Sequence, residues 1–258
     1  MTALRVYLAA ARLAAEQLRR EPDAWMVLAT TPLQSLAIVT ILQHTGRDDL
    51  VGIAIVGPGL MALVQVALFD AAEQLTVDRS RGVLEPLAAT PAPLVALDLG
   101  RSTVVLLVAL LGTVESLAVV HLATGGQSSV HHPAEAFLVL VATVWATAGF
   151  VLPCTALLLM TRATRALQNA IPWPLALVSG VLVPVALLPV WLQPVSPFLY
   201  LTHSAELLRA TTRPEPVSDL WTGLAVILVS GAVALVAGVV SRDRVFARLR
   251  RTGGLSLT

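Results

Sequence analysis

The chain contains no lysine, since all 17 of its basic residues are arginine. A Walker A phosphate loop, GxxxxGK[ST], needs its lysine to reach the phosphates of a bound nucleotide. Nucleotide binding by that motif is therefore excluded. Cysteine is nearly absent as well, because Cys154 is the only one. An intrachain disulfide is excluded for that reason.

Charge is scarce too. Only 13% of the 258 residues are charged, whereas 56% are hydrophobic, and the mean hydropathy is +0.80. This composition is typical of integral membrane proteins. A helix needs about 20 mostly apolar residues to cross a bilayer. Six stretches meet this requirement, namely 24–43, 51–71, 102–122, 136–160, 171–191 and 219–240.

The arginines are distributed unevenly over the connections between these stretches. Fourteen lie in the alternate connections that begin with the N-terminus and end with the C-terminal tail. The opposite side holds Arg47, Arg209 and Arg213. Basic residues concentrate in cytoplasmic connections. The sequence therefore predicts an all-α integral membrane protein with a single transmembrane domain over 1–258, six spans and both termini in the cytoplasm.

Residues 1–23 precede the first predicted span. Charged residues recur there at spacings of seven, four and three, at Arg5, Arg12, Glu16 and Arg19. These spacings place them on one helical face, opposite Leu4, Leu8 and Leu18. We expect an amphipathic helix that lies in the membrane interface. A solvated helix in a cytoplasmic extension is the alternative.

Polar residues inside the spans are candidates to line a substrate path, because unpaired polar groups are unfavourable in the bilayer. The candidates are Thr30, Thr31, Gln34 and Ser35 of the first span and Glu115 of the third. The first four could equally bond neighbouring helices together, and Glu115 could reach the outer interface. Asp98 and Arg101 are spaced three apart and could pair on one helical face.

Glycines and prolines interrupt two spans. Gly57, Pro58 and Gly59 of the second span are expected to kink or break that helix. The same is expected of the prolines in or beside the fifth span, which are Pro172, Pro174, Pro184 and Pro189.

The connection between the second and third spans, 72–94, mixes charged residues with leucine and valine. A short amphipathic helix on the cytoplasmic side suits the docking of a soluble partner. Its sequence VDRSRGVLEPLAATP resembles the loop motif F-E-R-E-x-G-T-L-E-x-L-L-A-T-P of ABC type 2 exporter permeases. The matching positions are Asp78, Arg79, Gly82, Leu84, Glu85, Ala89, Thr90 and Pro91.

A second stretch, SGVLVPVALLPVWL, is similar to the S-G-x-x-x-P-x-x-x-L-P-x-W-L pattern of the same family. It covers the later part of the fifth span and the first residue of the external segment 192–218. The chain departs from the family pattern at Val83, where threonine is usual, and at Tyr200, where proline is frequent. The resemblance covers nearly the whole chain.

The resemblance implies a permease subunit that exports an amphipathic drug, antibiotic or lipid-like substrate across the bacterial cytoplasmic membrane. It implies a second permease, as a homodimer or heterodimer, and a separate ABC ATPase subunit that holds ATP and magnesium. It implies no nucleic acid partner, and no cofactor or metal in this chain. The ATPase would dock on a coupling helix, through Asp78, Arg79, Gly82, Leu84, Glu85, Leu87, Thr90 and Pro91.

Other functions remain open from the residues alone. A membrane-embedded hydrolase would use Ser179 as nucleophile with His203. A self-sufficient channel or ion-coupled carrier would explain the spans equally well. His121, His131 and His132 flank or occupy one external loop, but only Glu135 stands nearby as a further ligand, and we expect no metal site there. Neither alternative function explains the stretch from Asp78 to Pro91.

Overall fold

The computed structural model of the chain describes residues 3–20, 26–46, 51–82, 94–123, 130–161 and 164–252. The elements in these residues are helices, so the predicted all-α fold is confirmed for them. They are α1 (Ala3–Arg20), α2 (Met26–His44), α3 (Val51–Ser80), α5 (Leu94–Ala123), α6 (Pro133–Met160), α7 (Thr164–Ala170), α8 (Pro172–Val178), α9 (Tyr200–Thr211) and α10 (Leu220–Thr252). Short 3-10 turns at Val185–Leu187 and Ser196–Phe198 lie between α8 and α9.

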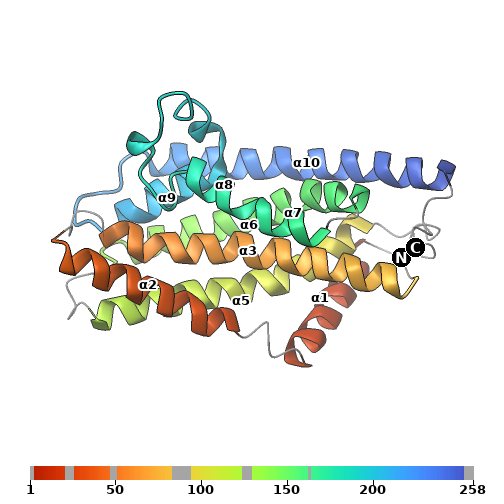
Figure 1. Ribbon diagram of the computed structural model, residues 1–258, viewed down its shortest axis with the longest axis horizontal. Coiled ribbons are helices and arrows are strands. Elements are labelled where there is room, and N and C mark those ends of the chain that lie inside the picture. Colours follow the sequence, from red (N-terminus) through yellow and green to blue (C-terminus); the bar gives the residue numbers. More distant parts are fainter. Residues whose placement is uncertain are drawn as a thin grey trace.

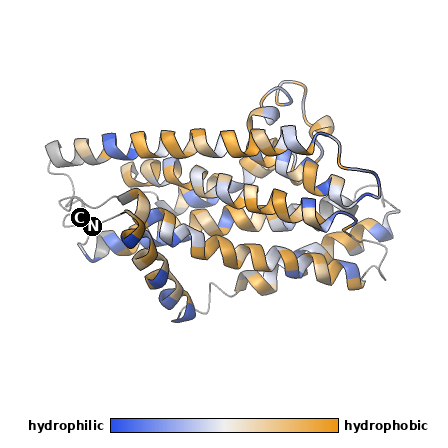
Figure 2. Ribbon diagram, turned by 180° about the vertical axis from the view of Figure 1, so that it is seen from behind, coloured by the Kyte–Doolittle hydropathy of each residue, from blue (hydrophilic) through white to orange (hydrophobic). Residues whose placement is uncertain are grey.

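The helices α2, α3, α5, α6 and α10 run roughly along the long axis of the molecule, and α1 crosses that direction at the end where both termini lie (Figure 1). Hydrophobic residues cover the middle of these helices, whereas hydrophilic residues gather toward the two ends and along α1 (Figure 2). Among the described residues, four helical stretches are long and apolar enough to cross a membrane. They are Ile55–Asp78, Val95–Ala123, Pro133–Met160 and Leu220–Val245.

These four stretches overlap the predicted second, third, fourth and sixth spans, and α2 overlaps the first. The helices are longer than the apolar runs from which they were predicted. The helix α3 continues beyond residue 71 to Ser80, α5 begins before residue 102 at Leu94, and α10 continues beyond residue 240. The expected break at Gly57–Gly59 does not occur, since α3 is assigned as one helix through Pro58.

The predicted fifth span, 171–191, does not form one helix. Its helical part, α8, ends at Val178, and the chain turns at Gly180, whose φ is +73°. Glycine adopts this left-handed conformation without steric cost. Backbone groups freed by the turn find partners far along the chain. Arg209 donates to the carbonyls of Gly180 and Val181 at 2.6 and 2.9 Å, and Ser196 Oγ donates to that of Val178 at 2.6 Å.

Buried hydroxyl groups attach α9 to α6. Thr143 Oγ1 donates to Ser204 Oγ at 2.8 Å, and Thr147 Oγ1 lies 3.0 Å from the Tyr200 hydroxyl. All four residues are buried. Irregular backbone is tolerated at membrane depth only where protein or a water-filled cavity surrounds it. These bonds explain how the segment after α8 is held against the bundle.

The contact between α6 and α10 is closer than ordinary side chains permit. A Cβ atom added at Gly149 would collide with the carbonyl oxygen of Gly231, and one added at Gly231 would lie 2.7 Å from Ala146 Cα. Small residues at such positions let helix backbones approach closely in membranes. The outward face of α10 is formed by exposed valine and leucine, including Leu228, Val229 and Val233.

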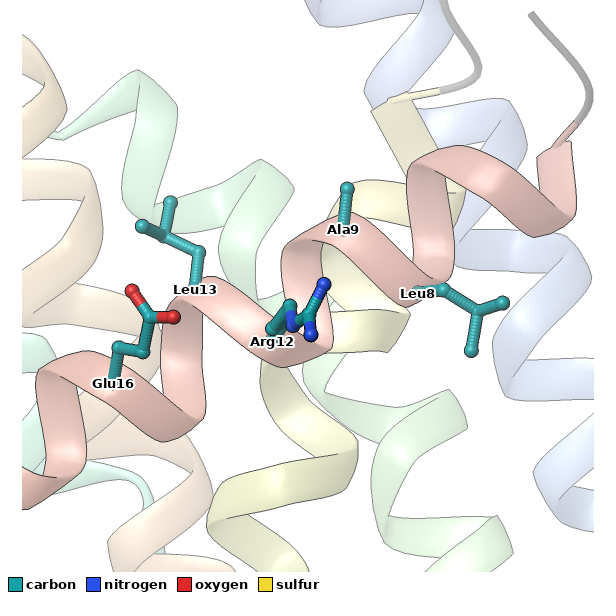
Figure 3. Close-up of a pocket in the computed structure, with 5 residues that line it drawn as sticks. All are labelled: Leu8, Ala9, Arg12, Leu13 and Glu16. Atoms are coloured by element: carbon teal, nitrogen blue, oxygen red, sulfur yellow. The ribbon is translucent and has the colours of Figure 1, made fainter.

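The helix α1 packs against α5 through alanine rather than leucine. Ala10 and Ala14 are buried, whereas Leu4 and Leu8 are exposed at 66% and 56%. The expected charged residues Arg5, Arg12, Glu16 and Arg19 are all exposed. On this outward face an open hollow of about 620 Å³ is lined by Leu8, Ala9, Arg12, Leu13 and Glu16 (Figure 3). The prediction that Leu8 lies opposite Arg12 and Glu16 is therefore wrong, because residues four apart on a helix differ in direction by only about 40°.

Candidate functional site

The residues predicted to dock an ATPase lie between α3 and α5. Asp78 and Arg79 belong to the last turn of α3, which ends at Ser80. Gly82 follows in a turn with φ of +65°, and a Cβ there would meet no atom within 4 Å. Its conformation, and not a lack of space, therefore favours glycine just past the helix end. The remaining predicted docking residues, Leu84, Glu85, Leu87, Thr90 and Pro91, lie outside the described residues.

Asp78 forms an ion pair with Arg101 of α5. The guanidinium Nη1 donates to Asp78 Oδ2 at 3.0 Å, and the two side chains are exposed by only 13% and 16%. This contact connects the end of α3 to the start of α5. The two helices that flank residues 83–93 are thereby attached to each other close to where α3 ends and α5 begins.

Asp98 pairs with Arg242 of α10, and both side chains are mostly buried. The predicted pair between Asp98 and Arg101 is therefore wrong. Residues three apart on a helix differ in direction by about 60°, so they share a face without facing the same neighbour. Arg101 turns toward α3, while Asp98 turns toward α10.

The same part of α5 also receives α1. The Tyr7 hydroxyl donates to Thr103 Oγ1 at 3.1 Å. A Cβ atom added at Gly100 would collide with the Tyr7 carbonyl oxygen and lie 2.9 Å from Ala10 Cβ. The first turns of α5 thus contact α1, α3 and α10 within a few residues. We call Asp98–Thr103 the junction segment.

The candidates for a substrate path divide into two groups. Thr31 and Ser35 are buried at 2% and 0%. Ser116 Oγ of α5 donates to Ser35 Oγ at 2.5 Å. This bond favours the interpretation of Ser35 as a contact between helices. Thr30, Gln34 and Glu115 are exposed on the surface of the chain.

Replacing Ser116 with alanine is expected to cost roughly 0.6–1 kcal/mol of unfolding free energy, because Ser35 stays buried without its donor. The double variant S35A/S116A should cost no more than S116A alone. Reversible unfolding in mixed micelles measures both. Thr40→Ala is the control, since that exposed hydroxyl bonds Leu36 within its own helix. A double variant clearly less stable than S116A would contradict the pairing.

The family model described as ABC-2 type transporter matches residues 5–212. The match runs from α1 through α9 and covers most of the chain. The chain belongs to the ABC-2 type transporter family. This ABC-2 permease is a multi-pass membrane protein that serves transport and is not itself catalytic. Membership implies an ABC ATPase partner in general. A comparison with curated proteins found no match.

Sequence reasoning missed the role of Arg242 in the permease. It counted Arg242 only as one of five arginines in the tail after the sixth span. Arg242 is the first of them after the apolar run that ends at residue 240, and so stands nearest the bundle. Its position next to the sixth span was the signal in the sequence that could have identified it as a contact with the bundle. Arg209, which caps the break after α8, was likewise counted only as an external charge.

The residues of the hydrolase alternative bond the permease backbone. Ser179 Oγ, fully buried, donates to the Ala176 carbonyl at 3.2 Å, and His203 Nε2 lies 2.9 Å from the Pro197 carbonyl. His131 and His132 bond carbonyls of the segment after α9, at Thr212 and Glu215. These bonds hold loops against the bundle.

Proposed function

We propose that the chain is the permease subunit of an ATP-driven exporter in the bacterial cytoplasmic membrane. Its cargo is an amphipathic drug, antibiotic or lipid-like molecule that moves outward. A separate ABC ATPase subunit holds ATP and magnesium, and a second permease, identical or different, completes the path. The observation that carries the proposal is the motif from Asp78 to Pro91, which lies between α3 and α5 in a chain of the ABC-2 family.

Charge supports the orientation in this proposal. The helix α1 and the C-terminal end of α10 lie at the same end of the bundle (Figure 1), and 14 of the 17 arginines belong to the alternate connections that include these two segments. That side is the cytoplasm by the distribution of basic residues. The steep angle of α1 to the other helices (Figure 1) supports the proposal that this helix lies in the membrane interface. Its exposed Leu4 and Leu8 would contact acyl chains there, and its arginines the headgroups.

The docking surface comprises the residues predicted from the motif. Charges at Asp78, Arg79 and Glu85 would orient the ATPase, and Leu84 and Leu87 would fill a groove on it. Thr30, Gln34 and Glu115 are the exposed polar residues proposed to face the cargo or the second permease.

Copurification with a candidate ABC ATPase subunit tests the proposal. The wild-type permease should retain the ATPase through size-exclusion chromatography in detergent. Glu85→Arg or Leu87→Arg should abolish the complex, because each places a new charge in the docking surface. Glu215→Arg makes the same charge change at an exposed position after α9 and should leave the complex intact. A wild-type chain that never retains the ATPase, or retention by both loop variants, would count against the proposal.

A further inference from the structure

The junction segment of α5 is a meeting point of four helices at the end of the bundle that holds the termini. Within Asp98–Thr103, successive side chains turn to different neighbours. The contacts are Asp98 with Arg242 of α10, Arg101 with Asp78 of α3, and Thr103 with Tyr7 of α1. A close backbone approach at Gly100 adds a further contact with α1. A displacement of this segment would therefore act on three helices directly.

The two ion pairs of the junction are mostly removed from water. The exposed fractions of the four side chains lie between 10% and 16%. Removing one partner of such a pair leaves a buried charge without compensation, which is strongly unfavourable. The two pairs therefore favour one relative placement of α3, α5 and α10, even where they add little net stability.

The position of these pairs along the chain gives them a mechanical role. Asp78 stands before the stretch 83–93 and Arg101 stands after it, so their bond holds the two flanks of that stretch together. Arg242 stands far away in sequence, beyond the residues matched by the family. Its ion pair with Asp98 thus connects α10 to the helix that follows the stretch 83–93, although the two are far apart in sequence.

We infer that the pairs Asp78–Arg101 and Asp98–Arg242 make the ends of α3, α5 and α10 move as one body, so that α10 follows a displacement of the docking surface. Arg242 and Asp98 are positioning residues for transport in this scheme. The inference rests on the proposed function for the source of the displacement, which is a docked ATPase. The rigid connection itself requires no ATPase.

Spin-label distances between α3 and α10 test the connection in the full chain. In a Cys154→Ala background, labels are attached at Glu73→Cys on α3 and Ala247→Cys on α10, both exposed positions. The parent should give one narrow distance distribution in detergent or nanodiscs. Arg242→Asp or Asp98→Arg should broaden it, and the charge swap D98R/R242D should make it narrow again. Arg244→Asp, an exposed neighbour with the same charge change, should leave it narrow.

The complex with the ATPase tests the coupling. When ATP is trapped in the ATPase subunit, the distance between the labels on α3 and α10 should stay unchanged in the parent and should change in R242D. If reversal variants do not fold, Arg242→Gln and Asp98→Asn replace them with the same expected broadening. The inference would be overturned if the distance distribution stayed narrow in every single variant or did not become narrow again in the charge swap. It would also be overturned if the distance in the parent changed with ATP. A chain that binds no ATPase refutes the proposed function instead, while the distances without ATPase still decide the rigid connection.

Discussion

Replacing Gly231 with leucine is expected to destabilise the folded chain by about 3 kcal/mol, at the upper end of the usual cost of overpacking. The new side chain would begin 2.7 Å from Ala146 Cα, which is backbone and cannot rotate away. The helices α6 and α10 would have to separate along this seam. Since α10 packs mainly against α6 and α9, few other contacts would hold it in place.

Unfolding in mixed micelles measures this effect, followed by the fluorescence of the five tryptophans, which include Trp145 on α6 and Trp221 on α10. The matched control is Ala232→Leu, which adds the same side chain to the exposed face of α10 one residue further on. The control should unfold within about 0.5 kcal/mol of the wild type, as surface substitutions usually do. Equal stability of the two variants would show that the close approach of α6 and α10 is incorrect.

Replacing Arg209 with leucine is expected to cost about 3 kcal/mol and to release the segment between α8 and α9. The guanidinium donates two hydrogen bonds, to the carbonyls of Gly180 and Val181, and a bond from a charged donor contributes about 1.5 kcal/mol or more. Leucine would leave both carbonyls without this partner where the helix breaks. The stability of Arg209→Lys should lie between those of the wild type and R209L, because lysine keeps a charged donor but not the planar guanidinium that sets Nη2 against both carbonyls.

Limited proteolysis at 180–199, together with the unfolding midpoint, checks this result. Arg213→Leu is the control, since Arg213 is exposed and lies one turn beyond Arg209. It removes the same charge from the same end of the bundle. If R209L and R213L are cleaved and unfolded alike, Arg209 does not hold the break.

Hydropathy located those helices well whose length is set by the apolar run itself. The stretch 136–160 became α6 and 24–43 became α2, because membrane-spanning backbone must bond within its own helix. Hydropathy could not place the ends of α3, α5 and α10. Bilayer thickness limits an apolar run, but a helix can continue past that run into charged residues, as α3 does through Asp70 and Asp78 to Ser80.

The segment 171–191 shows a different limit. Its apolar content satisfied the length of a span, and its prolines predicted a break without saying where it would fall. The break became possible because Arg209 and Ser196, far along the chain, supply hydrogen bonds to the carbonyls that it frees. Such partners depend on tertiary packing and leave no local pattern. The same reason explains the wrong pairing of Asp98 with Arg101, whose partners come from α10 and α3.

The docking residues were predicted by resemblance to a motif, and the structure describes only the first three of them, Asp78, Arg79 and Gly82. What it adds lies outside the motif, in Arg101, Asp98 and Arg242. Spacing along one helix could suggest that two of these residues interact. Only the tertiary contact between Asp98 and Arg242 of α10 identifies the third.

The uninterrupted length of α10 makes it a lever. Its 33 residues form a rod about 50 Å long at a rise of about 1.5 Å per residue, whereas the hydrocarbon core is about 30 Å thick. Gly231 is a natural fulcrum, since a Cβ atom there would lie only 2.7 Å from Ala146 Cα of α6. A tilt of about 10° about that point would carry the end at Thr252 through about 5 Å, from the same helical rise. A slight change in packing at the Gly231 contact would thus produce a displacement of several ångströms at the end of α10. A soluble subunit could respond to a displacement of this size or cause it.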